Sequence, residues 1–113
     1  MTRRAVFQRL GGLDESFFLY WEDADYCRRV AAAGFRRVYV PAADVRHVGG
    51  ASAEYDIVKA IRTFHESAFR FYWKHASLIG RLAAPMVGAG LWLRGKQRTG
   101  HELWRRRTSD DRR

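Results

Sequence analysis

Apolar side chains recur every three or four residues in two segments of the chain, which is the spacing of a helix with one buried face. Residues 3–10 form the first segment, and the pair Gly11-Gly12 supplies a backbone that can end a helix there. Residues 56–76 form the second, with apolar positions at Ile57, Ile61, Phe64, Ala68, Phe71 and Tyr72. We therefore expect a short helix near the start of the chain and a long helix in its second half.

The order of charges predicts a third helix, over residues 23–33. Acids stand at positions 22, 23 and 25, arginines follow at 28 and 29, and Gly34 closes the segment. Acids first, cations later and glycine at the end suit the helix dipole and the usual helix C-terminus. The aromatic run 17–21 just before it is too short for periodicity to separate a buried strand from a buried loop. We interpret this run as a loop packed on the core.

Two short stretches predict β-strands. Residues 36–40 are rich in β-branched and aromatic side chains and are followed by Pro41. Residues 44–48 form a second extended stretch, which runs into a loop containing Gly49 and Gly50. Strands among helices indicate an α/β fold class that is rich in helix.

The segment after residue 76 has a different character. Residues 78–93 are apolar apart from Arg81, but this stretch is shorter than the ~20 residues that span a bilayer, and Pro85 is expected to break or kink it. Residues 94–113 then carry 8 basic and 3 acidic side chains. We predict an apolar, amphipathic helical segment with a basic tail over residues 77–113. It would either lie at a membrane interface or pack on its own domain.

Composition narrows the class of protein. The 113 residues suit one small domain or a piece of a larger one, and 47% hydrophobic residues exclude a disordered chain. The net charge of +9 favours an anionic partner such as nucleic acid, lipid headgroups or a phosphorylated substrate. Cys27 is the single cysteine, so an internal disulfide is excluded and a reducing compartment is favoured.

The carboxylates at the predicted start of helix 23–33 are the clearest candidates for chemistry. Glu22 and Asp23 follow Tyr20 and Trp21, so they would lie at the mouth of an aromatic pocket. An ionised carboxylate there can accept a proton from a hydroxyl as that hydroxyl attacks an electrophile. The alternative is that these acids only stabilise the helix N-terminus. We expect Cys27, on the same helix, to be a buried structural thiol.

Several blocks of sequence together resemble a known family. They are residues 11–29, 33–35, 38–41, 45–52, 64–67 and 70–75. In this order they resemble the C-terminal half of the catalytic domain of family 2 glycosyltransferases, in the rhamnosyltransferase-like branch. The resemblance implies a partial GT-A-type (Rossmann-like) sandwich formed by residues 1–76. It also implies that a nucleotide-binding half precedes Met1, so that the chain is truncated and inactive by itself.

The resemblance assigns roles to individual residues. Asp23 aligns with the family's general base and Glu22 with the acid beside it, while His47 aligns with a histidine that can complete a divalent-metal site for Mg or Mn. Trp21 and Tyr20, just ahead of the acids, would either form a platform for a sugar ring or pack into the core. Asp23-Ala24-Asp25 spells the family's Asp-x-Asp motif, but that motif belongs to the earlier half. We therefore expect Asp25 to be an acid on the helix surface or one that supports a neighbour.

The function implied is inverting transfer of a sugar from a nucleotide-sugar donor to a glycan or lipid-linked acceptor hydroxyl, in cell wall or polysaccharide biosynthesis. The divalent metal is expected only in the complete enzyme. The resemblance favours a cytoplasmic protein, with the inner face of the plasma membrane, an anionic surface, as the place where a lipid-linked acceptor is met. A basic nucleic-acid-binding module is the first alternative, but no groove-reading motif is present and the acids would repel phosphate. A non-catalytic membrane-surface remnant is the second.

Overall fold

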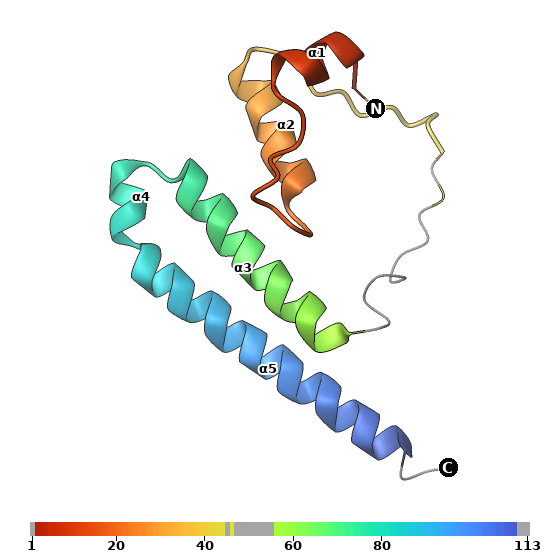
Figure 1. Ribbon diagram of the computed structural model, residues 1–113, viewed down its shortest axis with the longest axis vertical. Helices are drawn as coiled ribbons and strands as arrows, with labels where there is room; N and C mark the ends of the chain where they lie inside the picture. The colour runs from red at the N-terminus through yellow and green to blue at the C-terminus, as the bar shows by residue number, and fades with distance from the viewer. Residues whose placement is uncertain (1, 45, 47–55, 111–113) are drawn as a thin grey trace.

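The computed structural model describes residues 2–44, 46 and 56–110, and these residues form five helices (Figure 1). The helices are α1 (Arg4–Arg9), α2 (Glu22–Ala32), α3 (Ile57–His75), α4 (Leu78–Leu82) and α5 (Ala84–Asp110). The helices expected at residues 3–10, 23–33 and 56–76 are therefore confirmed to within one residue at each end. The expected helix-rich character is confirmed as well.

Glycine and aspartate set the ends of these helices as the sequence indicated. Gly12 has a φ of 74° and donates its N–H to the Phe7 carbonyl, which ends α1. Gly34 has a φ of 79°, and the N–H of the next residue bonds to the Val30 carbonyl, which ends α2. Asp56 begins α3 by accepting a hydrogen bond from the Lys59 N–H at 2.9 Å. Each of these hydrogen bonds satisfies a backbone group that the end of a helix leaves without a partner.

Alanine should have opposite effects at two of the glycines. At Gly34 a Cβ would have free space, but the positive φ of 79° costs an L-residue about 1 kcal/mol, so Gly34→Ala is expected to lower the free energy of unfolding by that amount. Gly90 lies inside α5, also in open space and without a positive φ. Gly90→Ala should therefore raise the free energy of unfolding by about 0.8 kcal/mol. Urea unfolding of both variants checks this, and a shift of the same sign in both would contradict it.

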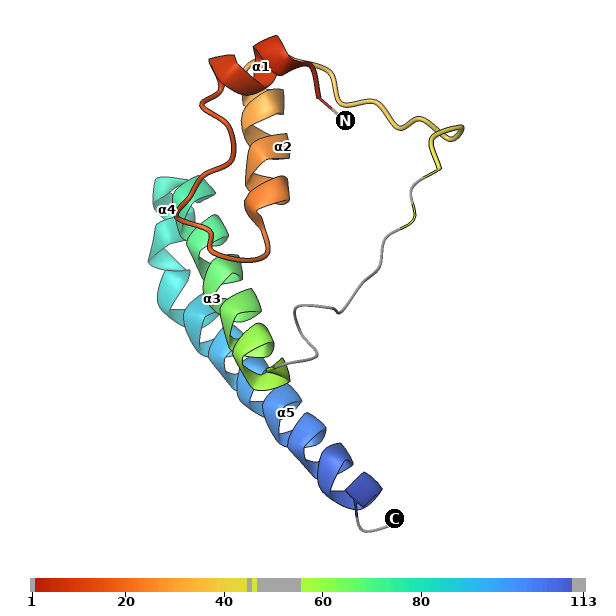
Figure 2. The same cartoon turned by 45° about the vertical axis from the view of Figure 1, so that its right-hand side comes forward.

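The molecule is a helical hairpin with a smaller two-helix unit beside one end of it. Helices α3 and α5 run antiparallel along each other, and the short α4 joins them (Figures 1 and 2). Helix α2 reaches the C-terminal end of α3, where the Arg28 side chain donates to the His75 carbonyl at 3.3 Å. Among the described residues the buried apolar side chains are few, and half of them are alanines; they are Phe17, Tyr26, Val30, Ala60, Ala68 and Ala84.

The strand prediction for residues 36–40 is wrong for this structure. These residues form no strand, and Val38, Tyr39 and Val40 are 65%, 87% and 54% exposed. A strand needs a paired neighbour for its backbone groups, and none of the described residues provides one. The second predicted strand, residues 44–48, lies largely outside the described residues. The α/β class and the GT-A sandwich therefore stay expectations from the resemblance.

The helical prediction for the C-terminal segment is confirmed. The break that was expected near Pro85 occurs at Ala83, between α4 and α5. Pro85 is the second residue of α5, where its missing N–H breaks no intrahelical hydrogen bond. None of the described helices is long and apolar enough to cross a membrane. The predicted domain boundary after residue 76 stays a prediction. Helix α5, which follows that boundary, packs on α3, which precedes it.

Candidate functional site

The loop before α2 brings an unusual backbone to the start of that helix. Tyr20 and Trp21 have φ values of 67° and 70°, in the left-handed region that side chains other than glycine avoid. The loop is held by the Ser67 hydroxyl, which donates to the Leu19 carbonyl at 2.9 Å. The Trp21 ring also lies 5.1 Å from the Phe71 ring on α3. Strain of this kind persists only where the surrounding structure fixes it, and it is concentrated at binding and catalytic sites.

Two polar atoms at this point are buried without a partner. The Trp21 indole Nε1 and the Glu22 Oε2 have no hydrogen-bond partner among the described residues. Such groups are uncommon because each carries the full cost of leaving water. One is a donor and the other an acceptor, the pair of functions that a bound hydroxyl group can satisfy. Asp23 is exposed, and its Oδ1 accepts a hydrogen bond from the Ala24 N–H at 2.7 Å.

Tyr20 and Trp21 lie as partly buried rings against α3. The Tyr20 ring is 5.6 Å from the Phe64 ring, and the Trp21 ring is 5.7 Å from the same ring. The aromatic loop is thus packed on α3, as expected, although Phe18 within it is 81% exposed. The structure brings Tyr20, Trp21, Glu22 and Asp23 together at one helix end. Their catalytic and sugar-binding roles stay predictions.

A fully buried carboxylate lies one turn further along α2. Asp25 is 0% exposed and binds the side chains of Lys74, His75 and Arg29. Its Oδ1 lies 2.7 Å from both the Lys74 Nζ and the His75 Nε2, and its Oδ2 accepts from the Arg29 Nε at 2.8 Å. Lys74 also binds the Asp14 carboxylate at 2.6 Å. We name these five residues the Asp25 network; it joins α2, α3 and the loop between α1 and α2.

Arg29 extends the network to the end of α1. Its two terminal nitrogens donate to the Leu10 carbonyl at 2.6 Å and to the Gly12 carbonyl at 2.7 Å. These carbonyls belong to the turn that closes α1, where backbone acceptors have no partner within the helix. A single guanidinium thereby fixes α1, the following loop and Asp25 relative to one another.

The network controls the pKa values of its members. Burial alone would raise the pKa of the Asp25 carboxyl, but hydrogen bonds from Lys74, Arg29 and His75 outweigh it, so this pKa lies below its ordinary value. The hydrogen bond from Lys74 also holds the pKa of Asp14 far below its usual range. Burial would lower the pKa of Lys74, but its bonds to Asp14 and Asp25 raise it overall. Asp25, Asp14 and Lys74 are therefore all charged at neutral pH.

Stability should consequently fall in acid. A carboxyl whose pKa is lowered by folding stabilises the protein above its unfolded pKa, near 4, and this contribution is lost as the pH falls through the folded pKa. The contribution of Lys74, whose pKa is raised, is present below about pH 10. We expect a constant urea midpoint between about pH 8 and 5 and a fall below that. The variant Asp25→Asn should show a smaller fall between pH 5 and 3. An equal fall in both proteins would contradict the role of Asp25.

Two expectations from the sequence are corrected here. Of the two roles expected for Asp25, the position on the helix surface is wrong, because the carboxylate is buried against Lys74 and His75 of α3, about 50 positions later in the sequence. Cys27 is exposed, so the expectation of a buried thiol is wrong. The buried face of α2 consists of Asp25, Tyr26 and Val30, and the helical rotation turns Cys27 away from it.

The predicted metal ligand, His47, lies outside the described residues. Within the described part of the chain, no group of three histidine, cysteine or acidic side chains could hold a metal ion. The fully buried carboxylate of Asp25 already binds Lys74, Arg29 and His75, which makes it a poor metal ligand. The described residues thus do not fit a metal centre.

The structure also gathers cations that the sequence did not bring together. A cavity of 620 Å³ lies among α2, α3 and α5, and Trp21, Arg28, His75, Arg94 and Arg98 contribute to its lining. Three guanidinium groups beside aromatic rings suit an anionic group such as a phosphate. The sequence showed a basic tail, but it gave no sign that Arg94 and Arg98 would lie beside Arg28, because that depends on how α5 packs on α3.

Part of the sequence is similar to the sequences of named rhamnosyltransferases. Over 71 residues, 63% of its length, the chain is 38% identical to the N-acetylglucosaminyl-diphospho-decaprenol L-rhamnosyltransferase of Mycobacterium tuberculosis. Over 81 residues, 72% of its length, it is 35% identical to the rhamnosyltransferase WbbL of Escherichia coli K12. The chain is therefore related to rhamnosyltransferases over these residues, which confirms the resemblance found in its sequence.

The similarity covers a limited part of each relative. The aligned residues make up 23% of the mycobacterial protein and 31% of the Escherichia coli protein, so the chain spans about a quarter to a third of the curated relatives it matches. No family model matches the chain. No solved structure matches it significantly.

Proposed function

We propose that this chain supplies the acceptor-activating part of an inverting rhamnosyltransferase-like glycosyltransferase. The sugar would pass from a nucleotide-sugar donor to a hydroxyl of a glycan or lipid-linked acceptor. The observation that carries the proposal is the start of α2, where an exposed Asp23 follows a strained loop and stands beside the unpartnered Trp21 Nε1 and Glu22 Oε2. The names of the two relatives support the same reaction class.

Each residue has a defined task in this proposal. The Asp23 carboxylate accepts the proton of the acceptor hydroxyl as the hydroxyl oxygen bonds to the anomeric carbon and the nucleoside diphosphate leaves from the opposite face. The Trp21 N–H and the Glu22 oxygen orient that acceptor through its other hydroxyl groups. The aromatic face of Tyr20 or Trp21 covers the apolar side of a sugar ring.

The arginine-lined cavity suits the anionic part of an acceptor. The mycobacterial relative is named for a substrate in which a diphosphate joins the sugar to a lipid. In the proposed complex, Arg28, Arg94 and Arg98 attract such a diphosphate. Trp21, which contributes to the cavity wall and lies two residues before Asp23, would contact the sugar. The cytoplasmic face of a membrane would be the place of reaction. A divalent ion, Mg or Mn, with His47 as a ligand, stays a prediction for the complete enzyme.

Sugar transfer by a chimaera tests the proposal. The aligned segment of the Escherichia coli relative is replaced by the corresponding residues of this chain, and transfer from nucleotide-activated L-rhamnose is measured. We expect the chimaera to transfer sugar and the 113-residue chain alone to be inactive, because positioning two substrates supplies much of the catalytic effect. A stably folded chimaera without activity would overturn the proposed function. Transfer by the 113-residue chain alone would overturn the expected need for a donor-binding part.

A further inference from the structure

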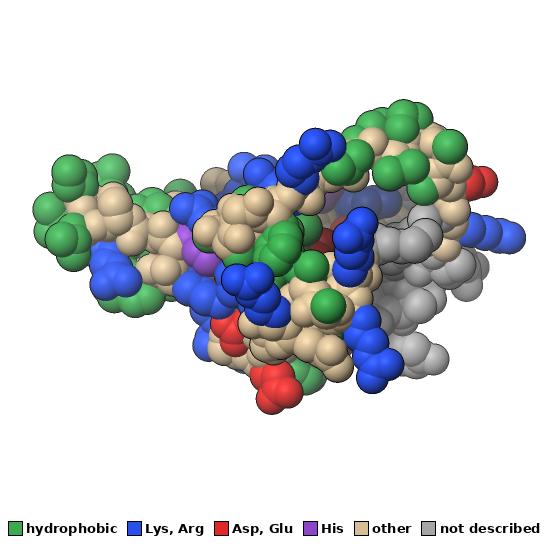
Figure 3. Space-filling model, turned by 90° about the horizontal axis from the view of Figure 1, so that it is seen from above, with side chains coloured by type: hydrophobic (Ala, Val, Ile, Leu, Met, Phe, Trp, Pro, Cys, Tyr) green, Lys and Arg blue, Asp and Glu red, His purple; other side chains and the backbone are tan. Residues whose placement is uncertain are grey.

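The α4 end of the hairpin exposes large apolar side chains. Leu78, Ile79 and Leu82 on α4 are 82%, 80% and 82% exposed, and Met86 in the first turn of α5 is 77% exposed. Hydrophobic side chains gather at this end of the molecule, on the left in Figure 3. We name these four residues the α4 tip. A soluble protein rarely exposes such a cluster unless the cluster has a partner.

The charges around the α4 tip select the kind of partner. Between Glu66 and Glu102 the chain has no acidic residue, whereas it has six cations, namely Arg70, Lys74, Arg81, Arg94, Lys96 and Arg98. The stretch includes the last turns of α3, all of α4 and the first half of α5. Lys74 is paired with Asp14 and Asp25, and the other five cations leave the α4 tip in a basic stretch of the chain. An apolar patch in such a stretch complements a surface that is apolar inside and anionic outside, as an acidic lipid bilayer is.

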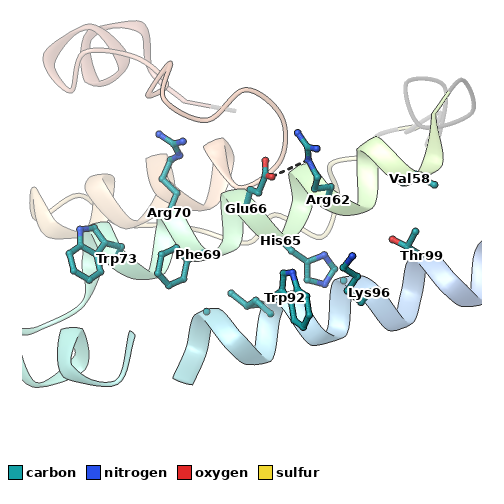
Figure 4. A pocket seen from close by; sticks show the side chains of 13 residues that line it. Val58, Arg62, His65, Glu66, Phe69, Arg70, Trp73, Trp92, Lys96 and Thr99 are labelled. Atoms are coloured by element: carbon teal, nitrogen blue, oxygen red, sulfur yellow. Dashed lines mark ion pairs between the residues drawn. The ribbon is translucent and has the colours of Figure 1, made fainter. Parts of the chain in front are cut away.

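A groove behind the tip has the composition expected at the headgroup level. It has a volume of 860 Å³, and Figure 4 shows Phe69 and Trp73 of α3 facing Trp92 and Lys96 of α5 across it. Two cations lie over its tryptophan rings: Arg81 is 5.4 Å from the Trp73 centroid and Lys96 is 5.5 Å from the Trp92 centroid. Tryptophan and long cationic side chains are the residues that proteins place at the boundary between lipid and water.

The dimensions are consistent with shallow insertion. Trp92 lies eight residues after the first residue of α5, which corresponds to roughly 12 Å along the helix at 1.5 Å per residue. Amphipathic elements insert about 5–10 Å into the boundary between headgroups and acyl chains. With the α4 tip at that depth, Trp92 comes to the outer headgroup level, and Lys96 lies about one helical turn further out. We propose that the α4 tip is a membrane-docking surface that inserts into anionic bilayers. This proposal is independent of sugar transfer.

Vesicle binding by the 113-residue chain tests the proposal. The vesicles contain phosphatidylglycerol and phosphatidylcholine, and co-flotation is measured at 0.1 M and 1 M salt. We expect binding to persist in 1 M salt, where charge attraction is screened beyond about 3 Å. The triple variant Leu78→Ser, Ile79→Ser, Leu82→Ser should bind about 30-fold more weakly at both salt concentrations, a conservative figure for partial burial of three aliphatic side chains.

A matched control uses exposed apolar residues far from the hairpin end. Val38, Tyr39 and Val40 are at least 54% exposed, and their triple serine variant should bind within twofold of the unmodified chain. Circular dichroism establishes that both variants keep their helices. Complete loss of vesicle binding by the unmodified chain in 1 M salt would overturn the proposal. Binding at 0.1 M salt would then be explained by attraction between the basic tail and the anionic lipid. Equal binding by the tip variant and the unmodified chain would also overturn it. So would a lack of vesicle binding together with a dimer that only the unmodified chain forms.

Discussion

Replacing Asp25 with asparagine should lower the free energy of unfolding by about 3 kcal/mol, the cost of removing one partner from a buried ion pair. The substitution keeps the size of the side chain but leaves Lys74 and Arg29 facing a neutral amide in place of a carboxylate. Because Asp25 is 0% exposed, water cannot replace the lost charge. Urea unfolding followed by circular dichroism gives the value.

The matched control for this experiment lies two residues away. Asp23→Asn makes the same chemical change on the same helix, but Asp23 is exposed. Its unfolding free energy should change by less than about 0.5 kcal/mol, as is usual for surface substitutions. Equal destabilisation by the two substitutions would show that the helix N-terminus, rather than the Asp25 network, is responsible. In the double variant Asp25→Asn, Lys74→Met, the loss should be smaller than the sum of the single losses, since each single substitution already removes the ion pair between Asp25 and Lys74.

The same Asp23→Asn substitution is expected to have its large effect on catalysis. In the active chimaera it should reduce sugar transfer about a thousandfold, within the range that general bases supply. Asparagine can still accept a hydrogen bond from the acceptor hydroxyl, but it cannot hold the proton. The acceptor should therefore bind with nearly unchanged affinity while kcat falls.

A neighbouring acid outside the proposed site provides the control for catalysis. Glu15 is exposed in the loop before α2 and belongs neither to the Asp25 network nor to the start of α2. Glu15→Gln in the chimaera should leave kcat within twofold of the unmodified chimaera. Retention of activity by the folded Asp23→Asn chimaera would exclude Asp23 as the base. Another group would then have to deprotonate the acceptor hydroxyl, and the proposal that the N-terminus of α2 activates the acceptor would fail.

The helices could be predicted from the sequence because their signals are local. The apolar period in residues 56–76, the glycines after α1 and α2, and the order of charges along α2 all act within a few residues. The strand at residues 36–40 could not be judged in the same way. Its β-branched composition is a local preference, whereas a strand forms only with a paired neighbour, which none of the described residues offers.

The same difference between local and distant signals decides which residues of the candidate site could be predicted. Glu22 and Asp23 could be identified because acids adjacent to an aromatic run at a helix start can be recognised in the sequence. The burial of Asp25 could not, because its partners Lys74 and His75 lie about 50 residues later in the chain. The left-handed backbone at Tyr20 and Trp21 was also beyond prediction, since it depends on how the loop packs against α3.

The way in which Arg29 and Lys74 tie three segments together has a consequence for the connection between α2 and α3. These charges hold the two helices in place from either side of that connection, while its described residues 36–44 are exposed. Substitutions of those exposed side chains should therefore leave the docking of α2 on α3 unchanged.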